Sequence, residues 1–381
     1  IDSANIIIDY DYNSSTEITL TSRVFTSELE EDDAPLGPIY DADRQTNLLD
    51  WQSALKLIKN YELFSIETSL STARARRYQL KEDRKFRFYI ADMNTGKLQI
   101  NIPTSDVEKL ILGVETERSH IETQDEYNAS DFKVSSSSTF ISYTNNTIKN
   151  LFIDSSFRAN QHDMYGLSAT YRIAGSYIIS NSGFRLHSSY GTGYRAPTLD
   201  EMYGSYGSLS IKEETSRSRD IGIEYSSFNK QLITDITFFS TQIDDLIGYA
   251  SLSPYKFENQ GSAKNNGIEI FIKYIPNKYI SINSHYNFLT TNNNGRSLSR
   301  RKKHSGKTSI NWVPENFTDL SINSITEYHS NARDGAFAGG HIAGYALFHS
   351  NINYTIDLNT KLQFKIENIL DQNYSESDTA G

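Results

Sequence analysis

Apolar and polar residues alternate along most of the chain, which is the pattern of β-strands that have two different faces. In residues 267–274, Ile and Tyr occupy every second position, and Gly, Glu, Phe and Lys stand between them. The alternation recurs in residues 280–288, 348–356 and 361–367. Many of these runs continue for about ten residues, whereas strands of soluble sandwiches usually have five or six. The pattern predicts an all-β fold with roughly sixteen to eighteen strands.

Short and long connections alternate between these runs, as in an antiparallel up-and-down barrel with tight turns on one side of a membrane and large loops on the other. Short turns are expected at residues 13–15, 276–278 and 358–360, and long polar loops at residues 28–46, 122–131, 191–214, 292–303 and 331–344. Tyrosines near the expected strand ends suit aromatic belts at the two membrane interfaces: Tyr10, Tyr171, Tyr190, Tyr225, Tyr274 and Tyr354. We therefore expect one transmembrane β-barrel domain over residues 1–381.

Composition agrees with a barrel and excludes several other classes. No run approaches the roughly 18 apolar residues that a membrane-spanning helix needs, whereas a barrel strand needs apolar residues only on its lipid side. The absence of cysteine excludes disulfide frameworks and cysteine nucleophiles. The net charge of -10 argues against a nucleic-acid partner, which calls for clustered Lys and Arg.

Four segments carry a family resemblance. Residues 190–204, YGTGYRAPTLDEMYG, resemble the strand-to-loop motif of TonB-dependent outer-membrane receptors. IDDLI with FENQGSA in residues 243–263, RRKKHSG at 300–306 and ENILDQNY at 367–374 agree in the same order. Within this family the spacing looks closest to the cobalamin (vitamin B12) transporters, although catecholate-siderophore receptors share several segments. The resemblance implies a monomeric bacterial outer-membrane protein, a 22-stranded barrel and active uptake of a large, scarce nutrient.

The resemblance also implies parts that are not expected within this chain. Members of the family carry an N-terminal plug domain and a periplasmic box that pairs by strand addition with the energy-transducing partner TonB. They end on a strand with a terminal aromatic residue, whereas this sequence stops at residues 378–381, where that strand should begin. We therefore expect the barrel portion of a larger receptor, incomplete at both ends, which works with TonB through a plug outside this chain.

An acidic segment is the candidate metal site. The sequence ELEEDDA begins at Glu28, and YDAD follows at residues 40–43. Such a dense cluster of carboxylates repels itself unless a hard cation such as calcium bridges it, and the alternative is a solvated acidic loop. The resemblance to cobalamin transporters places Asp33, the carbonyl of Ala34 and Asp43 at calcium-ligand positions. No cofactor is otherwise expected to be required.

Candidate cargo contacts lie in two of the long loops. The basic run at residues 300–303 concentrates positive charge at one rim, where an anchor to lipopolysaccharide phosphates is one interpretation. The resemblance instead maps Arg300 onto a cargo-contacting arginine and Phe337 onto a contacting aromatic residue. Tyr203 and Tyr206, in the loop at residues 191–214, are suited to line a ligand mouth.

Other polar residues receive structural interpretations. Arg195 stands before Pro197, where the strand should stop, and is expected to pair across the lumen or rim. Residues 197–214 contain no histidine, which counts against a haem receptor. The histidines show no close metal-ligand spacing and are expected at lumen or loop positions: His120, His162, His187, His285, His304, His329, His341 and His349.

Three alternatives to cobalamin uptake stay open on the sequence: a ferric-siderophore receptor, a passive porin-like or structural barrel, and a soluble β-rich binding protein. A catalytic role is not among them. No sequence signature picks out a nucleophile among the many serines, so no enzymatic activity is expected.

Overall fold

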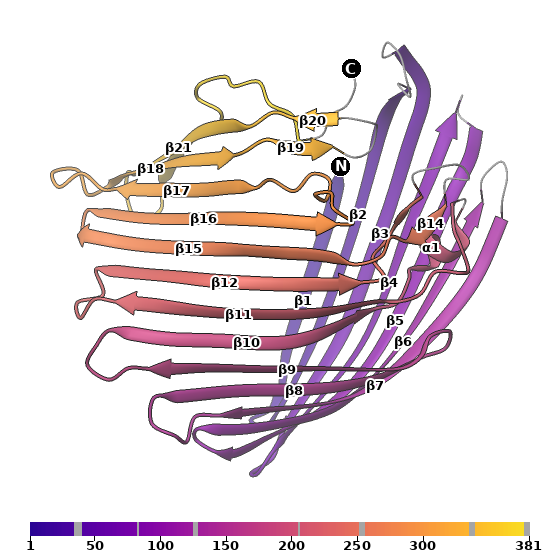
Figure 1. Ribbon diagram of the computed structural model, residues 1–381, viewed down its shortest axis with the longest axis horizontal. Coiled ribbons are helices and arrows are strands. Elements are labelled where there is room, and N and C mark those ends of the chain that lie inside the picture. Colours follow the sequence, from indigo (N-terminus) through magenta and orange to yellow (C-terminus); the bar gives the residue numbers. More distant parts are fainter. Residues whose placement is uncertain are drawn as a thin grey trace.

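The computed structural model describes residues 1–33, 40–81, 84–124, 129–204, 206–250, 256–334 and 340–376, with the side chains of residues 31–33 and 40–43 outside the description. Eighteen strands form one antiparallel sheet in which each strand pairs with the next along the chain (Figure 1). They are β1 (Asp2–Asn13), β2 (Thr16–Asp33), β3 (Tyr40–Asn60), β4 (Ser65–Lys81), β5 (Arg84–Ser105), β6 (Glu108–Gln124), β7 (Ala129–Asn145), β8 (Leu151–His162), β9 (Gly166–Ile178), β10 (Phe184–Arg195), β11 (Glu214–Ser226), β12 (Leu232–Asp244), β15 (Ala263–Asn277), β16 (Ile280–Asn293), β17 (His304–Trp312), β18 (Leu320–His329), β21 (Tyr345–Thr355) and β22 (Lys361–Ile366).

The remaining elements are small and lie in the long loops. They are the helix α1 (Leu199–Tyr203), the hairpin of β13 (Ile247–Tyr249) and β14 (Phe257–Asn259), and the hairpin of β19 (Ala332–Asp334) and β20 (Gly340–Ile342). No helix in the described ranges is both long and apolar enough to cross a membrane. The predicted all-β antiparallel fold is confirmed.

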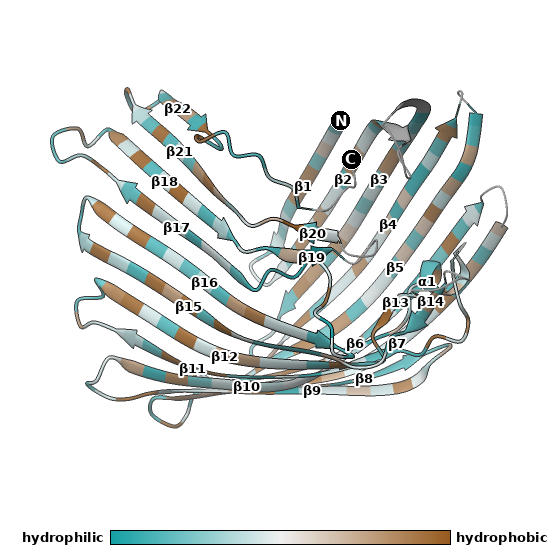
Figure 2. Ribbon diagram, turned by 45° about the horizontal axis from the view of Figure 1, so that its top comes forward, coloured by the Kyte–Doolittle hydropathy of each residue, from teal (hydrophilic) through white to brown (hydrophobic). Residues whose placement is uncertain are grey.

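The sheet curves into an open wall. Within the described ranges, β1 pairs only with β2 and β22 pairs only with β21, so these two strands are the edges of the wall. Figure 2 shows the wall as a U, with β1–β5 in one limb and β15–β22 in the other. The concave side of this U is the lumen.

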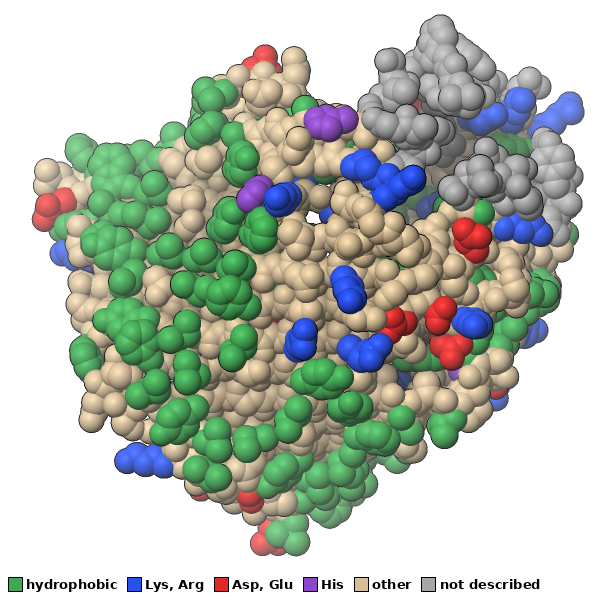
Figure 3. Space-filling view, viewed as in Figure 1, with side chains coloured by type: hydrophobic (Ala, Val, Ile, Leu, Met, Phe, Trp, Pro, Cys, Tyr) green, Lys and Arg blue, Asp and Glu red, His purple; other side chains and the backbone are tan. Residues whose placement is uncertain are grey.

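Strand pairing collects apolar side chains on the outward face. Ile221 of β11 is paired with Phe238 of β12, Phe238 with Ile268 of β15, and Ile268 with Phe288 of β16. Because paired residues on adjacent strands point to the same side, these four form one apolar row. The predicted alternation in residues 267–274 and 280–288 is therefore confirmed, and Figure 3 shows the apolar side chains of this face gathered toward one end of the strands.

Most of the predicted connections are confirmed, but one loop boundary is wrong. The tight turn after Asn13 and the turns at residues 278–279 and 356–360 lie between paired strands as predicted. The loop expected at residues 28–46 is much shorter, because β2 continues to Asp33 and β3 begins at Tyr40. Hydrogen bonds of a β-ladder join backbone groups and do not require apolar side chains. The acidic composition therefore gave the wrong boundary.

Candidate functional site

A cavity of about 900 Å³ opens between the inner side of β2–β8 and the loop that follows β10. Apolar side chains dominate its lining, among them Phe25, Met93, Ile121, Val134, Pro197 and Leu199. Polar and charged residues also line it, among them Arg23, Asp50, Glu117 and His162. A concave, largely apolar wall with a few polar groups is the usual character of a small-molecule site.

Tyr194 is a further polar residue in the lining of this cavity. Its hydroxyl is buried without a hydrogen-bond partner among the described residues. Burial, helped by the negative charge of Glu213, raises the pKa of Tyr194 to about 12. The hydroxyl therefore stays protonated at neutral pH.

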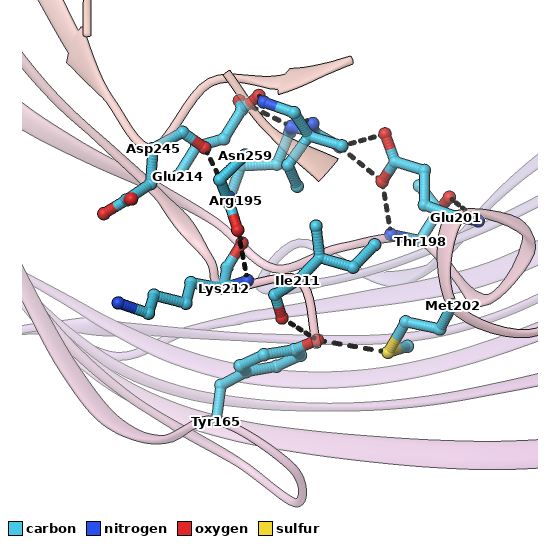
Figure 4. Close-up of polar contacts among 11 residues, drawn as sticks. Tyr165, Arg195, Thr198, Glu201, Met202, Ile211, Lys212, Glu214, Asp245 and Asn259 are labelled. Carbon is cyan, nitrogen blue, oxygen red and sulfur yellow. Dashed lines mark hydrogen bonds and ion pairs between the residues drawn. The ribbon is translucent and has the colours of Figure 1, made fainter. Parts of the chain in front are cut away.

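Arg195, the last residue of β10, ties the two flanks of the following loop together (Figure 4). Its Nε and Nη2 donate to the Glu214 carboxylate at 2.7 and 2.8 Å, and its Nη1 donates to the Glu201 carboxylate at 2.9 and 3.2 Å. Glu214 also accepts the backbone N–H of Ile247 at 2.7 Å, which joins β13 to the same cluster. The predicted pairing of Arg195 is confirmed, and we call these residues the Arg195 cluster.

Charge stabilises this cluster at neutral pH. Burial alone would raise the pKa of Glu214. The hydrogen bonds from Arg195 and Ile247, together with the charge of Arg195, lower it by more than burial raises it, so the pKa lies below its ordinary value. The hydrogen bond to Glu214 raises the pKa of Arg195, and the hydrogen bond to Glu201 and its charge raise it further. These effects outweigh burial, which would lower this pKa. Both carboxylates are only about one-seventh exposed, so removing the guanidinium would leave two poorly solvated negative charges.

The helix α1 begins at a reciprocal pair of hydrogen bonds, in which the side chains of two residues each accept the backbone N–H of the other. The Thr198 hydroxyl accepts the N–H of Glu201 at 3.1 Å, and the Glu201 carboxylate accepts the N–H of Thr198 at 2.7 Å. This capping box explains how a helix of five residues starts within a loop. Glu201 thus serves both the helix start and the Arg195 cluster.

Tyr203 anchors the far end of α1 to the wall. Its ring stacks on Phe132 of β7 with centroids 3.4 Å apart, and its carbonyl accepts a hydrogen bond from the Ser130 hydroxyl at 3.2 Å. Between these anchors, the Tyr165 hydroxyl donates to the carbonyl of Ile211 and contacts the Met202 sulfur, each at 3.2 Å. The loop therefore leaves β10, passes the β8–β9 turn and reaches β7.

Tyr206 lies beside the β13–β14 hairpin and is more accessible. Its side chain is 55% exposed, its ring meets that of Tyr249 edge-on, and its carbonyl accepts the N–H of Phe257. Asn259 fastens the same hairpin to the loop, because its amide donates to the carbonyls of Lys212 and Asp245 at 3.1 and 2.7 Å. Of the two tyrosines predicted as cargo contacts, Tyr203 is packed and Tyr206 is open to a ligand.

Arg300 belongs to a different loop, next to the β19–β20 hairpin. Its backbone has a positive φ of 55°, and its N–H donates to the carbonyl of Arg333 at 2.7 Å. Its Nε donates to both carboxylate oxygens of Asp334 at 3.2 and 3.1 Å, and Asp334 is only 2% exposed. The Arg300 side chain is still 52% exposed, so the pairing orients it without burying it.

The other predicted site residues are outside the description. Phe337 and Ala34 fall in the gaps at residues 335–339 and 34–39, and the side chains of Asp33 and Asp43 are not described. Among the described residues, no group of three or more His, Asp or Glu side chains could hold a metal ion. The calcium and Phe337 assignments stay predictions.

Two histidines lie where the sequence did not place them. His120 shares the outward row of β6 with Leu112 and Val114, and its two ring nitrogens lie 3.3 and 2.8 Å from Asp92 and Asp131. His304 is paired with the outward-facing Phe288. The expectation of lumen or loop positions is wrong for both, because strands that continue beyond the apolar band have water on both faces.

Comparison with known proteins now identifies the family. The chain matches the family described as "TonB dependent receptor-like, beta-barrel" over residues 2–369. It belongs to this family. TonB-dependent receptor barrels are outer-membrane proteins, so the wall spans the outer membrane, and the family comprises transport receptors, not enzymes.

Individual TonB-dependent receptors resemble the chain in sequence or in fold. The vitamin B12 transporter BtuB of Photobacterium profundum is 26% identical over 235 residues, covering 59% of this chain and 38% of that protein. The siderophore receptor PirA of Pseudomonas aeruginosa superposes with a TM-score of 0.79 at 11% identity, covering 97% of this chain and 67% of PirA. The copper transporter OprC gives a TM-score of 0.80 at 16% identity, covering 98% and 66%. These structures show the fold alone, and the chain spans about two thirds or less of each protein.

Proposed function

We propose that the chain forms the wall of a receptor for TonB-dependent uptake of a large, scarce nutrient, with cobalamin as the first candidate. The observation that supports cobalamin as the cargo is the sequence match to BtuB over 235 residues. The described loops support a capture site, because the Arg195 cluster, the capping box and the Tyr203–Phe132 stack hold one loop in place beside the luminal cavity. A loop that is already ordered loses less entropy when it binds its cargo.

In this proposal, Arg300 and Tyr206 contact the cargo from two different loops, and Tyr203 holds one of these loops in position. Phe337 is proposed as a further aromatic contact. Calcium, held by Asp33, the carbonyl of Ala34 and Asp43, would offset the repulsion among the carboxylates of the acidic segment that begins at Glu28. TonB supplies the energy through a plug, and the receptor acts as a monomer.

Calorimetry tests the cargo. Cyanocobalamin is titrated into a detergent-solubilised receptor that carries this chain, with and without calcium, in the wild type and in Arg300→Ala. We expect calcium-dependent binding that Arg300→Ala weakens by roughly tenfold or more, the usual scale of a hydrogen bond to a charged group. Arg301→Ala, the neighbouring change of the same type, is the control and should bind as the wild type does.

Two results would redirect the proposal. Binding of a ferric siderophore without binding of cyanocobalamin would favour the siderophore receptor, several of whose sequence segments this chain shares. Uptake that persists in cells lacking TonB would contradict energised transport and favour a passive barrel.

A further inference from the structure

The outward face of the wall changes from apolar to basic along single strands. On β11 the outward positions pass from Ile221 to Arg219 and then Arg217 toward the end that carries the long loops. On β15 the outward apolar positions end at Ile268, and Lys264 follows in the same direction. Figure 3 shows Lys and Arg side chains in the part of this face that lies beyond the apolar band. We call Arg217, Arg219 and Lys264 the outward basic patch.

Strand register brings the patch together. Arg217 is paired with Gln242 of β12, and Gln242 is paired with Lys264, so Arg217 and Lys264 stand in one row across three strands. Adjacent strands are about 4.8 Å apart, which puts the two Cα atoms roughly 10 Å from each other. Arg219 is the next outward residue on β11, one step nearer the apolar band. A single headgroup can therefore reach more than one of these side chains.

The charge of the patch is opposite to that of the chain. At the described outward positions of β10, β11, β12, β15 and β16, the charged residues are the three patch residues and Asp244, that is, three cations and one anion. The whole chain has a net charge of -10. Asp244 accepts a hydrogen bond from Arg217 Nη2 at 2.7 Å, whereas Arg219 and Lys264 are exposed and have no ion-pair partner within the described ranges. The patch therefore retains uncompensated positive charge.

Aromatic residues place the patch at the membrane interface. Arg219 is paired with Tyr190, whose ring centroid lies 5.9 Å from that of Tyr171 on the same outward face. Tyrosines that end an apolar band mark the level of lipid headgroups. The long loops of such barrels are extracellular, so this interface belongs to the outer leaflet. The three cations thus lie where lipid phosphates lie.

We propose that Arg217, Arg219 and Lys264 bind the phosphate groups of lipopolysaccharide in the outer leaflet. Arginine forks match phosphate oxygens in a bidentate geometry, and lysine adds a point charge. In the row of Arg219, the outward residues of β12, β15 and β16 are small and polar, namely Ser240, Asn266 and Thr290, so they leave room for a headgroup beside the cations. This surface goes beyond cargo uptake, and its test involves no cargo.

The basic run at residues 300–303, one interpretation of which was an anchor to lipopolysaccharide phosphates, is less suited to this contact than the outward basic patch. Arg300 is held by Asp334, and Lys302 donates to the Tyr345 hydroxyl at 2.7 Å. Tyr345 is buried, with only 6% of its surface exposed. Lys303 lies over the ring of Phe288, with its Nζ 5.6 Å from the ring centroid. Three of the four rim cations therefore make contacts within the protein, whereas Arg219 and Lys264 of the outward basic patch have no ion-pair partner among the described residues.

Binding of purified lipopolysaccharide tests the proposal. The detergent-solubilised receptor is titrated with lipopolysaccharide, and bound glycolipid is counted by native mass spectrometry. A basic residue near an anionic membrane surface contributes about fivefold in affinity, so the triple variant Arg217→Gln, Arg219→Gln, Lys264→Gln should bind at least ten times more weakly. Lys273→Gln, on the luminal face of the same strand β15, is the matched control and should leave binding unchanged.

A variant that should strengthen binding separates the proposal from an effect of misfolding, because a misfolded receptor would only bind more weakly. Asp244→Asn removes the anion beside Arg217 and should tighten lipopolysaccharide binding by a few-fold. Equal affinity of the wild type and the triple variant would overturn the proposal, as would equal binding of dephosphorylated lipopolysaccharide. Displacement by inorganic phosphate at millimolar concentration would also overturn it, because the patch would then be a general anion site.

Discussion

Two regions of the wall reach beyond the apolar band in different ways. From β2 to β7 the strands have 17 to 22 residues and continue outward as paired hairpins. From β8 to β12 the strands have 12 or 13 residues, and the chain between β10 and β11 forms a loop that contains α1. The first region extends by backbone pairing and the second by loops.

This difference determines where single side chains matter. Seventeen paired positions join β4 to β5, and each hydrogen bond of that ladder is made by backbone groups that every sequence has. The loop after β10 depends instead on the Arg195 cluster, the capping box of α1 and the stack of Tyr203 on Phe132. We therefore expect one substitution to release the loop, whereas an equivalent substitution in a long hairpin has little effect.

The largest effect is expected from Arg195→Met. The change leaves the carboxylates of Glu201 and Glu214 poorly solvated and without their partner. Breaking a fully buried pair costs about 3–5 kcal/mol, and because Arg195 is itself 41% exposed we expect roughly 2 kcal/mol of local stability to be lost. Hydrogen exchange should become faster in residues 196–213 and at the N–H of Ile247, with little change in the strands.

A matched ion pair in a long hairpin sharpens the comparison. Arg74 of β4 donates to both carboxylate oxygens of Asp92 on β5, and its side chain is 35% exposed. Arg74→Met removes a pair of similar geometry, yet the ladder around it remains, so we expect less than about 1 kcal/mol. Comparable exchange in the β4–β5 hairpin and in the loop after β10 would show that the two regions do not differ in this respect.

A smaller effect is expected where the two regions touch. Phe132→Ala removes the ring beneath Tyr203 and so separates α1 from β7. Stacked aromatic pairs contribute about 0.5–1.5 kcal/mol beyond the area they bury, so we expect about 1 kcal/mol. Exchange at the N–H of Gly204, which donates to Asp200 at the end of α1, reports the change.

The control for Phe132→Ala is an aromatic pair within the long hairpins. Tyr78 and Phe88 lie on the adjacent strands β4 and β5 with ring centroids 6.4 Å apart. Phe88→Ala should leave exchange in the β4–β5 ladder nearly unchanged. If Phe132→Ala were equally silent, the stack would not be what holds α1 against the wall.

Much of the sheet could be predicted from the sequence, because the alternation that creates it is local. Residues 267–274 show which side of β15 faces lipid without any knowledge of its neighbours. The same rule fails at Glu28–Glu30 and at His120, because beyond the apolar band both faces of a strand meet water and polarity no longer separates them. The five residues of α1 escaped prediction because tertiary contacts hold so short a helix.

The site could be predicted only in part. An arginine at a strand end beside a loop needs an acidic partner, so the pairing of Arg195 was foreseeable. Which carboxylates it meets depends on how the loop folds back, and Glu201 and Glu214 lie 6 and 19 residues away. The cavity could not be predicted from the sequence. Phe25, Met93 and His162 come from β2, β5 and β8, and only the curvature of the wall gives them a common cavity.

The smallest effect is the pH dependence of the loop. Because the folded pKa of Glu214 lies below its ordinary value of 4.5, its charge stabilises the cluster above that pH. This contribution is lost as the pH falls through the lowered pKa. Acidification below about pH 4.5 should therefore speed hydrogen exchange at the N–H of Ile247, by less than Arg195→Met does because the arginine remains. In Glu214→Gln this step should disappear, since the amide does not titrate. An unchanged acid response in that variant would assign the transition to another carboxylate.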